Sequence, residues 1–241
     1  MITIAYLYYD LLNLYGESGN IKALKKSLEE QGVRVSIHFL TLDDDLDFSK
    51  YDFVYMGAGT ENNQNLILPH LMKYREDIQQ QIEAGKFFLI TGNAINLFGK
   101  YILNQQNKKI KTLGIFNYYS KEESFRMIDE CIMRSPFFSE KIIGFQNQST
   151  VMKENDLPMF EVIKGVGSYP NSKTEGVHYK NFYGTYLIGP ILVRNPFFLK
   201  KIVKEVLLNK YPDYKFKKFD LKLQTKAYNN YNKNFNHEYI K

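Results

Sequence analysis

The chain has 241 residues, of which 44% are hydrophobic and 24% charged, with a formal net charge of +6. This balance is typical of a globular protein that buries a sizeable core, and no apolar stretch approaches the ~18 residues that a membrane-spanning helix needs. The single cysteine, Cys131, excludes an internal disulfide, and the N-terminal residues lack the basic start of a signal peptide, so we expect a cytoplasmic protein.

The first hundred residues alternate between strand and helix signals. Apolar runs at 2–8, 51–56 and 87–90 are typical of strands, and the alternation of apolar and polar residues at 33–39 predicts a half-exposed strand. Apolar residues at helical spacing predict one helix through Ile21, Leu24 and Leu28 and a longer one through Leu71, Tyr74, Ile78 and Ile82. The acidic run at 43–47 lacks the spacing of a calcium loop, and we interpret it as a solvated loop. The alternation predicts an α/β fold: an open, mostly parallel central sheet with helices on both faces.

The second half is predicted to be richer in β-structure. Residues 109–119, 124–133 and 141–145 resemble successive short strands. Asn195 and Pro196 then predict a helix start, with the asparagine as N-cap and the proline in the first turn, and Phe198, Ile202 and Val206 predict its buried stripe. We expect one domain over residues 1–210 and a basic helical tail, 211–241, packed on the same domain.

The tail is basic. Residues 211–241 contain seven lysines against three acidic residues, a net charge of +4, with phenylalanines and tyrosines interleaved. Such a pattern can bind nucleic acid. Leu223, Ala227 and Tyr231 fall at helical spacing, however, which favours an amphipathic helix with a solvated lysine face. We therefore expect no nucleic-acid partner.

Two turns of small residues follow predicted strands, at 57–59 and at 92–94. Ligands of open α/β sheets bind at the carboxyl ends of the strands, so the turns predict a shared crevice with Gly57, Gly59 and Asn93 as candidate ligand-binding residues. The second turn has the layout of a nucleophile elbow, which normally carries a reactive cysteine or serine beside oxyanion-stabilising N–H groups. Gly92 at its tip has no side chain.

Four segments resemble one known family. Residues 174–190 (TEGVHYKNFYGTYLIGP) are similar to the pattern TEGV-x-YKN-x-x-GTY-x-HGP of class I glutamine amidotransferases of the cobyric acid synthase (CobB/CobQ) type. The branch with the strongest resemblance is the glutaminase subunit, GatD, of lipid II isoglutaminyl synthase. Residues 7–20 resemble its YPD-x-x-NLYGD-x-GN, residues 57–64 its GGGQD-x-EQ and residues 144–148 its GFENH. The resemblance implies the flavodoxin-like class I glutamine amidotransferase fold.

The catalytic positions depart from that family. Its elbow reads CGGYQ-x-LG, and the cysteine thiolate attacks the amide of glutamine. Gly92 stands at the cysteine position and Ile188 at the position of the histidine base, while residues 93–96 (NAIN) replace GGYQ. Loss of such a nucleophile or base costs roughly a millionfold in rate. We therefore predict no catalytic residue, only a vestigial nucleophile position at Gly92 and a vestigial base position at Ile188. Arg126 falls near a family arginine beside the glutamine site, which makes it a candidate ligand residue or else an exposed strand arginine.

The resemblance implies a function without glutamine hydrolysis. We predict a GatD-like subunit that pairs with a Mur-ligase-like (MurT-type) subunit in the amidation of D-glutamate in a peptidoglycan precursor. The alternative is a stand-alone binding protein for a small amide or amino acid in the former glutamine pocket. A relocated active site that uses Thr91 or Cys131 is a third possibility. The scattered histidines lack metal-ligand spacing, so we expect no metal and no cofactor.

Overall fold

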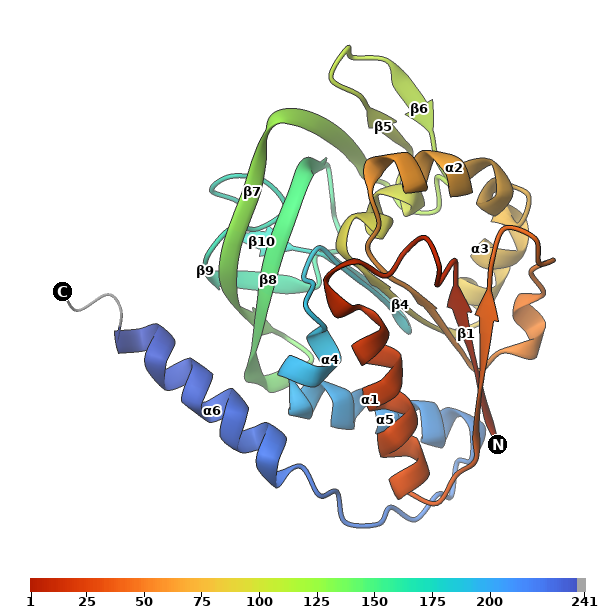
Figure 1. Cartoon of the computed structure of the whole chain (residues 1–241), viewed down its shortest axis with the longest axis vertical. Helices are drawn as coiled ribbons and strands as arrows, with labels where there is room; N and C mark the ends of the chain where they lie inside the picture. The colour runs from red at the N-terminus through yellow and green to blue at the C-terminus, as the bar shows by residue number, and fades with distance from the viewer. Residues whose placement is uncertain (238–241) are drawn as a thin grey trace.

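A six-stranded sheet forms the centre of the computed structural model, which describes residues 1–237 (Figure 1). The strand order is β11–β12–β4–β3–β1–β2, and every strand is parallel to its neighbours except β11, which is antiparallel to β12 at the edge. The strands are β1 (Ile2–Leu7), β2 (Val35–Leu40), β3 (Phe53–Met56), β4 (Phe87–Thr91), β11 (Val177–Tyr179) and β12 (Phe182–Thr185). The predicted α/β fold with a mostly parallel sheet is confirmed.

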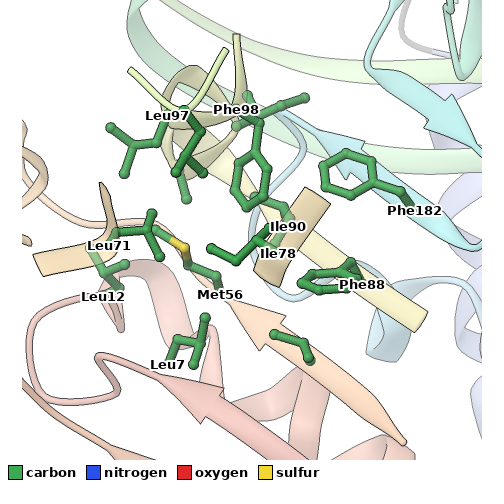
Figure 2. Packing of buried hydrophobic residues seen from close by; sticks show 14 of the residues in the cluster. Leu7, Leu12, Met56, Leu71, Ile78, Phe88, Ile90, Leu97, Phe98 and Phe182 are labelled. Atoms are coloured by element: carbon green, nitrogen blue, oxygen red, sulfur yellow. The ribbon is translucent and has the colours of Figure 1, made fainter. Parts of the chain in front are cut away.

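Helices cover both faces of this sheet. Successive side chains of a strand point to opposite faces, so Met56 and Ile90 contribute to one apolar layer and Tyr55 and Leu89 to the other. Figure 2 shows part of the first layer. The first layer packs against α2 (Glu61–Met72) and α3 (Arg75–Glu83), and the second against α1 (Ser18–Glu30), α4 (Ile191–Arg194) and α5 (Pro196–Lys210).

The second sheet is dominated by two long antiparallel strands, β7 (Tyr119–Ser135) and β8 (Phe138–Lys153). The second half is thus β-rich, as predicted, but the predicted bounds were wrong. The segments at 124–133 and 141–145 lie within these longer strands, and of 109–119 only Lys109–Lys111 and the first residue of β7, Tyr119, are in strands. The remaining strands are β5 (Tyr101–Leu103), β6 (Lys109–Lys111), β9 (Phe160–Lys164) and β10 (Thr174–Glu175).

The helix predicted through residues 71–82 is two helices. Tyr74 has φ −103° and ψ 12°, which are not helical values. The end of α2 tightens into bonds from Lys73 N to His70 O and from Tyr74 N to Leu71 O, the i→i−3 pattern that commonly closes a helix. Leu71 and Ile78 are nevertheless both buried in the same layer. The apolar spacing therefore located the buried face correctly but could not show the break.

The start of α5 was predicted correctly, with Asn195 at the N-cap position, but the side chain of Asn195 has another role. Asn195 makes no side-chain capping bond to the helix. Its Oδ1 accepts from Ile143 N and its Nδ2 donates to Ile143 O. The asparagine therefore ties α5 to β8. The predicted stripe of α5 is buried as expected.

The tail begins with a segment without regular secondary structure, 211–221, followed by α6 (Lys222–His237). The predicted buried face of α6 is wrong for Leu223, which is 78% exposed, and for Ala227, which is exposed. Tyr231 is partly buried as predicted, but the most buried residue of the helix is Tyr228, which is 8% exposed and packs against Ile132 and Ile143. Within residues 1–237, no helix combines the length and the apolarity needed to cross a membrane.

Candidate functional site

The elbow between β4 and η3 (Gly92–Phe98) turns sharply at Gly92. Gly92 has φ +63°, a left-handed conformation that glycine adopts at little cost and that nucleophile elbows hold under strain. The segment that follows the strand, η3, is a 3-10 helix. The elbow geometry is therefore present.

A small cavity opens at this elbow. Its volume is about 210 Å³, below the ~300–1,000 Å³ of typical ligand pockets. Gly59, Asn93 and Arg126 line it, together with the predicted nucleophile and base positions, Gly92 and Ile188; the other lining residues are Leu14, Tyr15, Ala58, Thr60, Glu61 and Asn147. The structure thus brings most of the candidate residues together.

Gly57 is the candidate that does not line the cavity. A Cβ built on it would lie 2.7 Å from the carbonyl oxygen of Leu12 and 3.0 Å from Cβ of Glu17. Glycine is needed here because the chain after β3 passes against another backbone segment. Gly57 therefore has a packing role behind the cavity.

The tip of the elbow has no room for a side chain. A Cβ built on Gly92 would lie 2.5 Å from Cβ of Ala58 and 2.9 Å from Cγ2 of Ile188. Ile188 is held in place by a backbone bond from its N to Phe145 O, at 2.9 Å. Ala58 and Ile188 together fill the space into which a side chain on residue 92 would project.

Asn93 joins the two turns. Its Nδ2 donates to Gly59 O at 2.8 Å, and its Oδ1 accepts from Gly59 N at 3.2 Å. The two turns lie side by side because β3 and β4 are neighbouring parallel strands, with Met56 opposite Ile90. The backbone N–H of Gly59 is therefore already bonded.

The opposite wall carries an ion pair. Arg126 Nη2 donates to Glu61 Oε1 at 3.1 Å, and Arg126 Nη1 donates to Asn147 Oδ1 at 3.1 Å. Ser149 Oγ also donates to Glu61 Oε1, at 2.9 Å. Partial burial alone would raise the pKa of Glu61, but its backbone N–H, Ser149 and Arg126 outweigh it and lower that pKa. The wall thus offers one fixed cation and one fixed anion.

A buried polar network lies beneath the elbow. The hydroxyl of Thr91 donates to Glu17 Oε2, as does Tyr55 OH at 2.6 Å, and Asn20 Nδ2 donates to Tyr55 OH at 2.8 Å. Glu17 and Thr91 are 0% exposed. Burial raises the pKa of Glu17, against the hydrogen bonds from Thr91 and Tyr55. The Thr91 hydroxyl therefore points away from the cavity.

Three other polar residues could be considered for catalysis, but none of them lines the cavity. Asn96 is buried and bonded to Thr150 and Ser120. Cys131 is buried, which raises the pKa of its thiol to about 12. His178 packs against Tyr183, and burial lowers its pKa to about 4. Within the described part of the chain, no group of three or more His, Cys, Asp or Glu residues could hold a metal ion.

Sequence reasoning missed Ala58, Glu61 and Asn147 as lining residues. Each lies inside a motif that the sequence displays, at 57–64 or 144–148. Ala58 could have been predicted to line the cavity, because its methyl group is the one side chain in the turn Gly57-Ala58-Gly59 that can project toward the elbow.

Three comparisons connect this geometry to known proteins. The CobB/CobQ-like glutamine amidotransferase domain matches residues 3–196. The chain is 33% identical over 213 residues to the lipid II isoglutaminyl synthase (glutamine-hydrolyzing) subunit GatD of Streptococcus pneumoniae, covering 87% of this chain and 82% of the relative. It is 29% identical over 194 residues to the subunit of the same name from Staphylococcus aureus, covering 80% and 79%.

The fold is also similar to solved structures. A crystal structure of a glutamine amidotransferase from Thermotoga maritima matches with a TM-score of 0.52 at 12% identity, covering 96% of this chain and 92% of that one. This likeness concerns the fold alone, and it agrees with the predicted class I glutamine amidotransferase architecture.

Proposed function

The chain belongs to the CobB/CobQ-like glutamine amidotransferase family, and we propose that it is a GatD-like subunit that does not itself hydrolyse glutamine. The observation that carries the proposal is the closed tip of the elbow. A glutaminase of this kind needs a thiolate on the elbow residue, and Ala58 and Ile188 occupy the space of any side chain at position 92.

The other catalytic parts support the same proposal. Ile188, at the base position, can neither accept nor donate a proton. The Gly59 N–H, one donor that could stabilise an oxyanion beside the elbow, is bonded to Asn93 Oδ1 instead. Of the described residues that line the cavity, none is a cysteine, serine or histidine.

A relocated nucleophile is not supported by the contacts. Thr91 is buried and its hydroxyl is bonded to Glu17. Cys131 is 0% exposed, and a thiol with a pKa of about 12 supplies almost no thiolate near neutral pH. Nucleophile and base must lie within hydrogen-bond reach of each other and of the substrate, and these two residues offer no such pair.

The relatives indicate the process in which such a subunit acts. Both are named as the GatD subunit of a glutamine-hydrolyzing lipid II isoglutaminyl synthase. We propose that this chain keeps the partnership of that family with a MurT-type, Mur-ligase-like subunit in the cytoplasm. The partner would activate the D-glutamate carboxylate of the peptidoglycan precursor, and ammonia would come from solution or from another donor.

The test is reconstitution with a MurT-type, Mur-ligase-like protein from the same organism. We expect the two to co-purify and to amidate the precursor with ammonium chloride but not with glutamine as nitrogen source. The S. pneumoniae GatD pair, assayed in parallel, is the positive control for glutamine use. Amidation with glutamine at a comparable rate would show that the chain hydrolyses glutamine, and a strictly monomeric chain without such a partner would refute the partnership.

A second candidate function rests on the wall formed by Arg126, Glu61 and Asn147. A fixed cation beside a fixed anion matches a zwitterionic amino acid, so the chain could bind one without cleaving it. A ligand at about 100 times its dissociation constant stabilises a protein by about 2.7 kcal/mol. Thermal unfolding in the presence of glutamine, glutamate or asparagine distinguishes the two candidate functions, because a scaffold that binds none of them shows no rise in unfolding temperature. Arg126→Ala should remove any rise that occurs.

A further inference from the structure

A second, larger cavity lies in the C-terminal part of the chain, away from the elbow. It has a volume of about 780 Å³, lies between α6, the start of α5 and residues 218–222, and shares no lining residue with the elbow cavity. Figure 1 shows α6 along one side of the molecule, beyond α4 and α5. We call it the lysine groove, because five lysines line it: Lys200, Lys218, Lys222, Lys226 and Lys233.

The charge of the lysine groove is not compensated. Among the described residues, Asp220 is its one acidic lining residue, and none of the five lysines forms an ion pair with a carboxylate there. Two other lysines of α5 do form such pairs: Lys201 with Glu205 and Lys210 with Asp52. A concentration of one sign of charge in a concave surface attracts ions of the opposite sign. The groove therefore favours an anionic occupant.

An apolar residue stands beside these charges. Leu223 is 78% exposed, and Ala227, one turn later, is also exposed. Both follow lysines of the groove in sequence, Lys222 and Lys226, but lie outside its lining. At the surface of a lipid bilayer, an exposed leucine can enter the headgroup region while neighbouring lysines contact anionic headgroups.

The aromatic side chains of the groove are not available to stack on bases. The ring of Phe197 packs edge-on against Tyr228, with 5.5 Å between centroids, and Lys200 Nζ lies 5.5 Å from the centre of the Phe219 ring. Single-stranded nucleic acids are bound on free aromatic faces. The groove's described cations are also all lysines, without the forked guanidinium that binds phosphate in a bidentate manner. Nucleic acid is therefore the less favoured occupant.

A single tightly held phosphate is also less favoured. Lys218, Lys222, Lys226 and Lys233 are exposed, so their ammonium groups create a broad field and not a rigid cradle. We propose that α6 and residues 218–222 form a docking surface for anionic phospholipid headgroups. The proposal does not depend on the proposed function, since its residues lie outside the elbow.

The test compares two triple variants of the full chain that have the same net charge. Lys222→Gln/Lys226→Gln/Lys233→Gln removes lysines of the groove, and the control Lys73→Gln/Lys108→Gln/Lys111→Gln removes exposed lysines elsewhere. Each variant is sedimented with vesicles of phosphatidylcholine alone and of equimolar phosphatidylcholine and phosphatidylglycerol. Thermal unfolding of both variants verifies that they are folded.

We expect the wild-type chain to bind the mixed vesicles and not the neutral ones. A lysine near an anionic surface is worth roughly fivefold in partitioning, so the groove variant should bind on the order of 100-fold more weakly and the control nearly as well as wild type. Added salt should release the protein, because the Debye length falls from about 10 Å at 0.1 M to about 3 Å at 1 M. Leu223→Ser should weaken binding further.

Three results would overturn the proposal. One is equal binding to neutral and anionic vesicles, and another is an equal loss in both triple variants. The third is competition: if inorganic phosphate or an oligonucleotide displaced the protein from vesicles at an ionic strength at which sodium chloride did not, the groove would bind that anion and not a lipid surface.

Discussion

The side chain of Asn93 and the backbone of Gly59 bond each other in both directions, across the turns that follow two neighbouring strands. Nδ2 donates to the Gly59 carbonyl at 2.8 Å, while Oδ1 accepts from the Gly59 N–H at 3.2 Å. The amide side chain of Asn93 thereby joins the two turns and fixes their spacing.

Asn93→Ala removes both bonds and leaves two backbone groups of Gly59 without a protein partner. We expect a loss of about 1–3 kcal/mol in the free energy of unfolding, measured by urea denaturation. The control is Asn62→Ala, at an exposed position on α2, which should change stability by no more than about 0.5 kcal/mol. Equal effects of the two substitutions would mean that the paired bonds do not hold the turns.

Gly92→Ala tests the closed tip. The new methyl group would clash with Ala58 and Ile188 in a left-handed conformation, and we expect a cost of about 2–4 kcal/mol. Gly114→Ala is the matched control, because Gly114 has φ +61° and the nearest atom to its Cβ position is Thr112 O at an ordinary contact distance of 4.0 Å; it should cost about 1 kcal/mol. Ala58→Gly/Gly92→Ala should recover at least about 1 kcal/mol relative to the sum of the single changes. Strict additivity in this double-mutant cycle would contradict the steric account.

Glu175 should make stability depend on pH. It is 0% exposed, and burial raises its pKa from 4.5 to about 7, against hydrogen bonds from Thr185 Oγ1 and Tyr186 N. Because the folded state holds the proton more tightly, the stability contribution is complete below pH 4.5 and is lost as the pH rises through 7. The expected loss is about 3 kcal/mol.

The measurement is urea denaturation between these pH values for the wild type and for Glu175→Gln. The difference in unfolding free energy, wild type minus variant, should fall as the pH rises. Burial also raises the pKa of Glu17, which acts in the same direction but is unchanged in the variant and cancels. Glu76→Gln, at an exposed position on α3, should keep the wild-type curve. Parallel curves for the wild type and Glu175→Gln would refute the assignment.

Tyr228 should anchor α6. Its ring packs against Ile132, Ile143 and Phe197, and its hydroxyl donates to Lys141 O at 2.7 Å. Tyr228→Ala should cost about 3 kcal/mol locally and accelerate amide hydrogen exchange throughout residues 222–234. Leu223→Ala should leave exchange unchanged, since Leu223 is exposed. The reverse outcome would mean that the buried face is the one that sequence spacing predicted.

Much of the fold could be predicted from sequence because the central strands are nearly continuous apolar runs and their turns are marked by glycines. The errors have definable causes. In α6, tyrosine at 228 and leucine at 223 both fit a helical stripe, and only the neighbouring β8 decides which one is buried. Asn195 has the right residue type for a cap, but the edge of β8 offered it two backbone partners.

The site was predictable in its location but not in its detail. The turns at 57–59 and 92–94 predicted a shared crevice, and the structure places Gly59, Asn93 and Gly92 around one cavity. The bonds between Asn93 and Gly59 could not be predicted, because they depend on the distance between two loops. The hydrogen bond from the buried Thr91 to Glu17 likewise could not be predicted, because it depends on where the start of α1 packs.

The packing of Ala58 and Ile188 against Gly92 also constrains how this lineage can evolve. A chain that acquired a side chain at position 92 first would lose stability before it gained any chemistry, and a histidine at position 188 alone would have no nucleophile to serve. A side chain at position 92 therefore fits only after changes at both of its neighbours, residues 58 and 188. A single substitution cannot open the tip of the elbow, and a coordinated set of three is needed.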